Sequence, residues 1–261
     1  MFEASLMSGQ RILVTGGGTG LGRAMAERFL SLGADVAICG RRQSVCEETA
    51  AQWREQFPGR RIDTFGVDIR IAQQVDEMVE SLFQSGGLTG LVNNAAADAI
   101  GERMLFADET SEHWNNVITG TLSSAAWLTR GALRHMLKAG HGSIVNISSR
   151  QAERASPGFG AYAAAKGGMN ALTRALAVDY GKKAIRCNAL SVGYVVNERR
   201  DAGMTDQRRA EVEAMHLTRP GHPDDIAYAA VFLLSREAEF ITGTLIPVDG
   251  GATIARGKVL G

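Results

Sequence analysis

Short apolar runs and longer amphipathic stretches alternate along the chain. Arg11–Val14 is an apolar run, and the stretch after the following glycines places apolar residues at helical spacing until Gly33 ends the pattern. A second apolar run, Asp35–Cys39, completes a β-α-β unit. Repetition of this order predicts a doubly wound α/β fold with a seven-stranded, mainly parallel sheet and helices on both faces. Strands are expected near residues 11–15, 34–39, 62–67, 88–92, 142–147, 184–190 and 244–248, and helices near 20–32, 43–56, 71–85, 111–138, 161–181 and 223–235.

Length and charge narrow the class of protein. The 261 residues fit a single domain, 1–261, with a large core. The 28 Lys and Arg balance 28 Asp and Glu, which gives no electrostatic reason to expect nucleic acid or an anionic membrane as a partner. No apolar stretch approaches the ~20 residues of a membrane span, and the start of the chain lacks the features of a secretory signal. The three scattered cysteines suit reduced thiols in a cytoplasmic protein, and no metal cluster is expected.

A glycine-rich turn joins the first strand to the first helix. The segment Thr15-Gly-Gly-Gly-Thr-Gly-Leu-Gly22 lets backbone N–H groups approach an anion closely, and the positive end of the helix dipole favours its charge. Its glycine spacing differs by one residue from the commoner dinucleotide fingerprint. We therefore predict a phosphate cradle here, with a glycine turn that binds no nucleotide as the alternative.

Tyr162 and Lys166 lie four residues apart in a stretch of strong helix composition. Residues at this spacing share one helix face, with Cβ atoms about 5–6 Å apart. A phenol near a fixed ammonium is expected to have a pKa below its usual value of about 10, because the positive charge favours the phenolate. Tyr162 is therefore expected to donate or accept a proton at neutral pH. The competing interpretation is a packed ring beside a lysine whose amine reaches solvent.

The glycine turn and the Tyr-Lys pair together resemble the short-chain dehydrogenase/reductase family, and the resemblance runs from about Gln10 to Gly251. It implies a Rossmann-like fold. It also implies a substrate lid at about residues 191–222, where this chain has a long, charged connection; a solvated loop is the alternative. Further motifs match the family in order along the chain: Asp68 after the third apolar run, Asn93–Ala96, Gly142–Ser149, Ile185–Leu190 and Ile246–Gly251.

The resemblance implies a site at the carboxyl edge of the sheet, where ligands bind in open α/β folds. Ser149 would hydrogen-bond the substrate oxygen, and Tyr162 would pass the proton. Lys166 would lower the pKa of Tyr162 and hold the ribose of the nicotinamide. Ser148 competes with Ser149, but Ser149 has the favoured spacing of thirteen residues before the tyrosine. The residues implied to bind the dinucleotide are Gly16, Gly18, Thr19, Gly20, Leu21, Gly22, Arg41, Arg42, Asp68, Ile69, Asn94, Tyr162, Lys166, Val195 and Asn197.

Three positions depart from the family pattern. Thr121 stands in place of a helix asparagine that supports a water-linked proton relay, and a hydroxyl cannot reproduce the donors and acceptor of a carboxamide. The Pro-Gly turn after the sixth strand is Val192-Gly193, and Asn197 replaces the threonine that usually contacts the nicotinamide carboxamide. Because the serine, tyrosine and lysine of the family are complete, we predict a working enzyme with an altered relay, to which Thr121 belongs, or with an altered substrate.

The end of the second strand bears on the choice of cofactor. Family members that use NAD(H) place an acidic residue there to hold the ribose hydroxyls. This chain has Gly40-Arg41-Arg42, and an arginine pairs a 2′-phosphate through two parallel hydrogen bonds. We predict NADP(H), with NAD(H) as the alternative, and the sequence leaves open which arginine faces the phosphate. Two observations weigh the other way: arginines also begin solvated helices, and Thr19 lies where many NADP(H)-using members have a basic residue.

These features predict an NADP(H)-dependent oxidoreductase, similar to carbonyl or 3-oxoacyl reductases, that interconverts a ketone and a secondary alcohol. The alternatives are an NAD-dependent secondary-alcohol dehydrogenase and a non-catalytic dinucleotide-sensing protein on the same fold. The partner is a small carbonyl or alcohol substrate: a 3-oxoacyl thioester, a steroid or bicyclic ketone, a sugar or an aryl ketone. Small and apolar residues at 96–100 and 155–159 favour an apolar ketone.

The resemblance also implies a homotetramer or homodimer, assembled through the helices near 111–138 and 161–181 and through the final strand with its tail. One face of the second helix has the apolar spacing that such an interface needs, although a core face has the same pattern. The residues on this face are Ala161, Ala165, Met169, Leu172 and Leu176.

Overall fold

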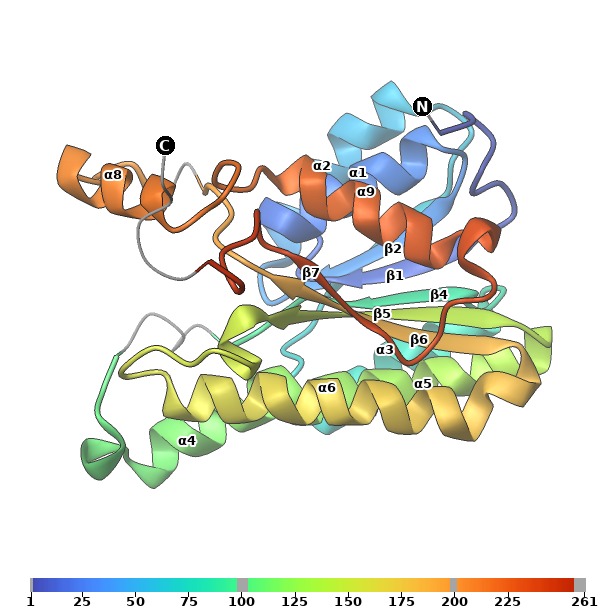
Figure 1. Ribbon diagram of the computed structural model, residues 1–261. Coiled ribbons are helices and arrows are strands. Elements are labelled where there is room, and N and C mark those ends of the chain that lie inside the picture. Colours follow the sequence, from blue (N-terminus) through green and yellow to red (C-terminus); the bar gives the residue numbers. More distant parts are fainter. Residues whose placement is uncertain (1, 98–102, 198–200, 256–261) are drawn as a thin grey trace.

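The computed structural model describes residues 2–97, 103–197 and 201–255 and shows a central sheet between two layers of helices (Figure 1). The seven strands lie in the order β3-β2-β1-β4-β5-β6-β7, and every pairing between them is parallel. The predicted fold is therefore confirmed. The strands are β1 Arg11–Thr15, β2 Asp35–Gly40, β3 Ile62–Gly66, β4 Gly90–Asn93, β5 Gly142–Ser149, β6 Ile185–Val192 and β7 Leu245–Val248. The main helices are α1 Gly20–Ser31, α2 Gln43–Gln56, α3 Ala72–Gln84, α4 Ser111–Ile118, α5 Ser124–Ala139, α6 Gly160–Tyr180, α8 Asp206–Ala214 and α9 Pro223–Leu234.

The sheet separates two hydrophobic cores. Successive side chains of a strand point to opposite faces. In β1, Ile12 and Val14 therefore enter the core beneath α1, α2 and α9, whereas Leu13 enters the core beneath α3, α5 and α6 (Figure 1). Because both faces are covered, the inner strands β1, β4, β5 and β6 are buried almost throughout, as is usual for parallel sheets. The strand order reverses between β1 and β4, which places a ligand crevice at the carboxyl ends of these two strands.

The single helix expected over 111–138 is interrupted. Residues Thr119–Ser123 form a π-helical turn between α4 and α5. At this turn Gly120 lies so close to the chain after β4 that an added Cβ would be 3.0 Å from the Cβ of Ala97. The hydroxyl of Thr121 accepts a hydrogen bond from the N–H of Ala97, at 3.4 Å. The π-helical turn therefore packs against the chain just after β4, at the edge of the crevice. Such turns are frequent at functional sites.

The proposed interface face of α6 is a core face. Ala161, Ala165, Met169 and Leu176 are all at most 8% exposed within the chain, and Leu172 packs against the same interior. Side chains buried by their own fold are not available to a second subunit. Of the two interpretations that the spacing allowed, the structure supports the core face, while the oligomeric state itself stays a prediction.

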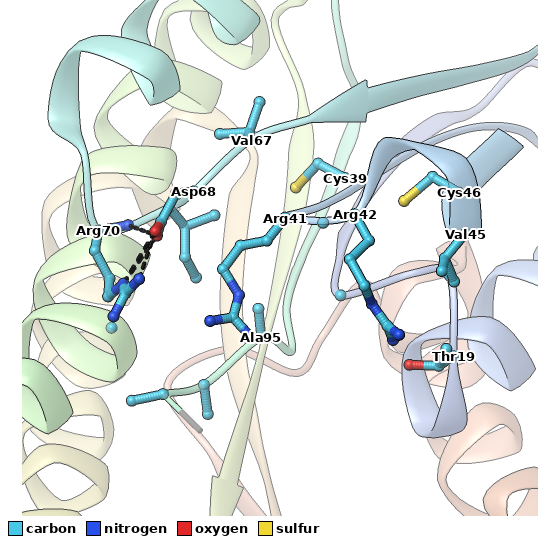
Figure 2. A pocket seen from close by; sticks show the side chains of 17 residues that line it. Thr19, Cys39, Arg41, Arg42, Val45, Cys46, Val67, Asp68, Arg70 and Ala95 are labelled. Atoms are coloured by element: carbon cyan, nitrogen blue, oxygen red, sulfur yellow. Dashed lines mark hydrogen bonds and ion pairs between the residues drawn. The ribbon is translucent and has the colours of Figure 1, made fainter. Parts of the chain in front are cut away.

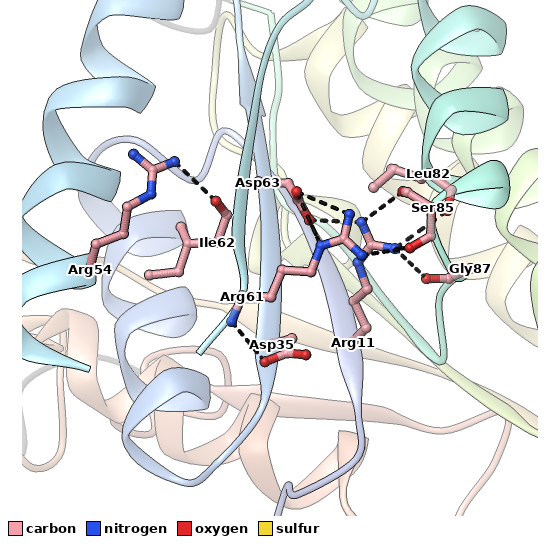
Figure 3. A network of polar contacts seen from close by, with 9 residues as sticks. All are labelled: Arg11, Asp35, Arg54, Arg61, Ile62, Asp63, Leu82, Ser85 and Gly87. Carbon is pink, nitrogen blue, oxygen red and sulfur yellow. Dashed lines mark hydrogen bonds and ion pairs between the residues drawn. The ribbon is translucent and has the colours of Figure 1, made fainter. Parts of the chain in front are cut away.

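Arg11 links several elements at the edge of the sheet formed by the amino ends of the strands, opposite the crevice (Figure 3). Its guanidinium donates to the carbonyl oxygens of Ser85 at 2.9 Å and Gly87 at 3.1 Å, just beyond the C-terminus of α3. It also pairs with the carboxylate of Asp63 in β3 at 2.7 Å, and the two side chains are 10% and 25% exposed. One arginine thus satisfies carbonyls left unpaired beyond the end of a helix and links β1 to β3 across β2.

We expect Asp63→Asn to lower the free energy of unfolding by about 1–3 kcal/mol, because it leaves the charge of Arg11 largely buried without its carboxylate. The matched control is Asp76→Asn, which breaks an ion pair with Arg130 whose side chains are 57% and 63% exposed. Exposed pairs contribute about 0–1 kcal/mol. Urea denaturation of both variants at one protein concentration provides the comparison, and equal losses would show that the Asp63 pair does not stabilise the edge.

Candidate active site

Ser149, Tyr162 and Lys166 come together at the carboxyl edge. Ser149 is the last residue of β5, and Tyr162 and Lys166 lie one turn apart near the start of α6. The phenol of Tyr162 hydrogen-bonds Ser149. Ser149 is 8% exposed, Lys166 is 2% exposed and Tyr162 is partly buried, so the group is largely shielded from water. Electrostatic interactions in such a group are stronger than in water.

Ser148 belongs to the core and not to this group. It is 2% exposed, and its hydroxyl donates to Oδ1 of Asn170 at 2.6 Å. The alternation of side chains along β5 therefore places Ser149, and not Ser148, beside Tyr162.

Lys166 is held between the sheet and the phenol ring. Its Nζ donates to the carbonyl oxygen of Ile147 at 2.6 Å and lies 5.7 Å from the centroid of the Tyr162 ring. Burial lowers the pKa of Lys166 to about 7. A small change in surroundings or pH near neutrality therefore changes the charge of this amine.

The pKa of Tyr162 does not follow the sequence-based prediction. Burial raises the pKa of Tyr162 above its usual value, and the hydrogen bond with Ser149 offsets only part of that rise. The charge of Lys166 is not among the causes that set this pKa, and burial lowers the pKa of Lys166 itself. The expectation of a depressed tyrosine pKa is therefore wrong. A protonated phenol at neutral pH is placed to give a proton rather than to take one.

Thr121 is fully buried in the π-helical turn, where its hydroxyl is bonded to the backbone of Ala97. In the part of the chain that the structure describes, this hydroxyl forms no hydrogen bond with Lys166. Its part in a proton relay stays a prediction.

The glycine turn has the shape of an anion cradle. Gly16 has φ 65°, which side chains rarely adopt, and a Cβ on Gly22 would lie 2.2 Å from the carbonyl oxygen of Gly16. Thr19 begins α1 without a side-chain cap, and the first turn of α1 carries no acidic residue. The first N–H groups of α1 and the positive end of its dipole are therefore available to bind an anion. The side chain of Asn94 donates to the carbonyl oxygen of Thr15 at 2.8 Å and so fixes this turn to the end of β4.

A cleft runs from the cradle to the ends of β2 and β3 (Figure 2). Arg41 and Arg42 both line it and are both exposed. Figure 2 shows Arg41 extending across the cleft toward Ala95, whereas Arg42 points toward Thr19. The two arginines thus reach different parts of the same cleft, a distinction that the sequence left open.

Asp68 and Ile69 line this cleft as well. The carboxylate of Asp68 pairs with Arg70 at 2.6 Å, and this contact holds the pKa of Asp68 below its usual value. Arg70 also lines the cleft and donates to Asn116 at 2.8 Å. Arg70 was not among the residues predicted from the sequence. The signal that could have identified it is a basic residue two positions after Asp68.

The remaining residues predicted to bind the dinucleotide lie around the cradle. Leu21 packs partly into the core, and Val195 is buried and bridges Gly221. The backbone N–H of Asn197 donates to Asp201 at 2.8 Å, and its side-chain nitrogen lies 3.9 Å from where a Cβ on Gly20 would be. Asn197 is thus close to the start of α1.

The segment predicted to form the lid contains the helix α8. The parts of the predicted pocket and lid at 98–102 and 198–200, and the tail at 256–261, lie outside the described residues. No helix of the described part of the chain has the length and apolar character to span a bilayer.

Comparisons with known proteins agree with this geometry. A family model described as enoyl-(acyl carrier protein) reductase matches residues 16–253. The 3-oxoacyl-(acyl-carrier-protein) reductase of Chlamydia muridarum is 35% identical, over 95% of this chain and 98% of that protein. The structure of a putative gluconate dehydrogenase from Agrobacterium tumefaciens matches with a TM-score of 0.91 and 32% identity, over 98% of this chain and all of that one.

A gluconate 5-dehydrogenase from Burkholderia cenocepacia, solved with NADP and tartrate, matches with a TM-score of 0.89 and 29% identity, over 97% of this chain and 99% of that one. The chain belongs to the short-chain dehydrogenase/reductase family. It is an oxidoreductase similar to 3-oxoacyl reductases, of a family that binds nicotinamide dinucleotides.

Proposed function

We propose that the protein is an NADP(H)-dependent oxidoreductase that interconverts a ketone and a secondary alcohol. The observation that carries the proposal is the shielded group of Ser149, Tyr162 and Lys166 at the carboxyl edge, where the phenol bonds the serine and the amine lies over the phenol ring. The glycine cradle opens at the same edge of the sheet, at the end of β1. Proton donor and anion cradle therefore share the edge at which the family binds its cofactor.

Each side chain has a role that its surroundings support. The bound dinucleotide supplies or takes the hydride. Ser149 holds the substrate oxygen through its hydroxyl and stabilises the alkoxide as negative charge develops. Tyr162 gives that oxygen its proton, since its raised pKa keeps the phenol protonated at neutral pH. Lys166 holds the nicotinamide ribose, and a charged Lys166 favours the phenolate that remains after proton transfer.

The preference for NADP(H) rests on the cleft beyond the cradle. Two arginines and no carboxylate follow β2, and the carboxylate of Asp68 is already paired with Arg70. Arg41 reaches across the cleft (Figure 2) and is the residue that we assign to the 2′-phosphate. A related gluconate 5-dehydrogenase of known structure is in complex with NADP.

Arg41→Ala is expected to weaken the binding of NADPH by roughly tenfold or more and the binding of NADH much less. The reason is that a charge-assisted hydrogen bond to the 2′-phosphate contributes about 1.5–3 kcal/mol. Arg42→Ala, whose side chain points toward Thr19 instead, is the matched control and should have the smaller effect. Gly40→Asp should shift preference toward NADH, because a carboxylate repels the phosphate and accepts from the ribose hydroxyls. Dissociation constants from fluorescence titration decide the matter; equal weakening of both cofactors across the set would refute the assignment.

The same proposal includes a single domain in which the segment 191–222, with α8, covers the substrate. It also includes a cytoplasmic homotetramer or homodimer. Only the resemblance to the family supports the homo-oligomer, because the apolar face of α6 is buried within the chain.

A further inference from the structure

A second cavity, of about 270 Å³, opens beside the residue that follows Ser149. Residues from three segments far apart in the sequence line it: the chain after β5, the C-terminal end of α8, and the turn after β7. Its walls are Met215 and four alanines, and its polar lining consists of Arg150, Arg154 and Ser156. It is thus a small pocket with two positive charges and no negative one.

Arg150 is partly buried and poorly paired in this pocket. Among the described residues, the only hydrogen bond of its side chain joins Nη2 to the thioether sulfur of Met215, at 3.9 Å. A thioether is a weak acceptor, whereas a guanidinium has five N–H donors. No carboxylate in the part of the chain that the structure describes forms an ion pair with Arg150. The donors of Arg150 and the positive charge of the cavity therefore suit an anion with oxygen acceptors.

The pocket around Arg150 is built before any ligand binds. Arg154 donates through Nη1 to the carbonyl oxygens of Ala252, Thr253 and Ala255 at 3.2, 3.2 and 2.9 Å, and so fastens the turn after β7 to the segment after β5. The side chain of Gln151 bonds Ser156 twice, at 2.7 and 3.0 Å. Arg154 therefore forms a wall of the pocket and adds charge, while most donors of Arg150 stay available.

We propose that Arg150 forms an anion subsite that binds a carboxylate of the substrate, so that the enzyme acts on oxo acids or the corresponding hydroxy acids. This inference rests on the proposed function, because the oxygen to be reduced lies at Ser149 and Tyr162. Arg150 directly follows Ser149 in the chain, with Cα atoms ~3.8 Å apart, so the proposed subsite lies next to the residue that is proposed to hold the substrate oxygen. An arginine binds a carboxylate through two parallel hydrogen bonds, which fixes the orientation of the molecule as well as its affinity.

The test compares acids with their neutral esters in wild type and in Arg150→Gln. The probes are 4-acetylbenzoate and 5-oxohexanoate, each beside its methyl ester, with acetoacetyl-CoA as a thioester probe. We expect Arg150→Gln to lower kcat/KM for the acids by roughly tenfold or more while leaving the esters nearly unchanged. Arg208→Gln is the matched control, because Arg208 lies on α8 but pairs with Glu211 at 2.9 Å instead of lining the cavity. It should alter neither class.

A binding measurement separates this proposal from the proposed function. Binding of 4-acetylbenzoate is measured by calorimetric titration of two proteins, the Tyr162→Phe variant and the double variant Tyr162→Phe/Arg150→Gln. Both carry Tyr162→Phe, so the measurement does not depend on turnover. Weaker binding of the acid in the double variant supports the subsite even if no ketone is reduced by the wild type. Equal binding in both proteins overturns it. A loss of activity by Arg150→Gln that is the same for acids and esters, or that is largest for acetoacetyl-CoA, also overturns it.

Discussion

Replacing Tyr162 by phenylalanine is expected to lower kcat by about 10²–10⁴-fold, the range typical of a general acid or base. The ring packs with the small apolar cluster formed by α4 and α6, and this packing survives the change. What is lost is the phenol that bonds Ser149 and holds a proton at neutral pH. Cofactor affinity should stay nearly unchanged, which fluorescence titration measures beside the steady-state rate.

Tyr180→Phe is the matched control for this variant. Tyr180 ends the same helix, packs against the core and lies at the far end of α6 from Ser149. The same chemical change there should leave turnover intact. Nearly full activity in Tyr162→Phe with a good substrate would refute the assignment of the proton donor.

Lys166→Met is expected to lose both turnover and cofactor affinity, since the amine serves the phenol and the ribose. The dissociation constant of the dinucleotide should rise by roughly tenfold or more, as loss of a charge-assisted hydrogen bond implies. The methionine side chain fills similar space without a charge, and Lys166 is buried, so a thermal melt checks that the fold is retained. Loss of turnover at unchanged affinity would show that Lys166 does not hold the cofactor.

The pKa of Lys166 gives this prediction a pH dependence. Burial lowers that pKa to about 7 in the protein without cofactor, and the amine is charged below its pKa and neutral above it. Affinity for the dinucleotide should therefore fall as the pH rises through about 7, by about tenfold between about pH 6.5 and about pH 9. In Lys166→Met this fall should be absent. Parallel pH profiles of the two proteins would contradict the role of the ammonium.

The fold was predictable because its signals are local and repeated. Apolar runs of strand length alternate with amphipathic helices, and the parallel pairing of all seven strands follows from that order. Most element ends agree with the predicted ranges within about two residues, the uncertainty expected for such boundaries. The π-helical turn at Thr119–Ser123 could not be predicted, because it depends on contact with the backbone of Ala97, a residue distant in sequence.

The candidate site was predictable in its members but not in its electrostatics. Spacing identified Ser149, Tyr162 and Lys166, and the fold brings them together. The direction of the pKa of Tyr162 was wrong, because spacing describes the nearby charge and says nothing about burial, which dominates here. The apolar face of α6 was ambiguous for a related reason, since a core face and an interface have the same periodicity.

Arg150 shows what a linear motif leaves out. In the sequence Arg150 is simply a charged residue that follows Ser149, and no neighbouring residue in the chain indicates that it binds a ligand. Its significance comes from Met215 and the turn after β7, which enclose it without supplying a carboxylate. Contacts of this kind join segments about 65–100 positions apart, and no local pattern encodes them.

The central claim is that the protein transfers a hydride between NADP(H) and a carbonyl carbon, with Tyr162 supplying the proton. The most direct measurement uses NADPH in which deuterium replaces both hydrogens on the reactive carbon of the nicotinamide, with a ketone or oxo-acid substrate. Mass spectrometry should find one deuterium on the carbinol carbon of the product alcohol for each NADPH consumed, and Tyr162→Phe should form almost none. Product without deuterium, or undiminished labelled product from Tyr162→Phe, would contradict the account.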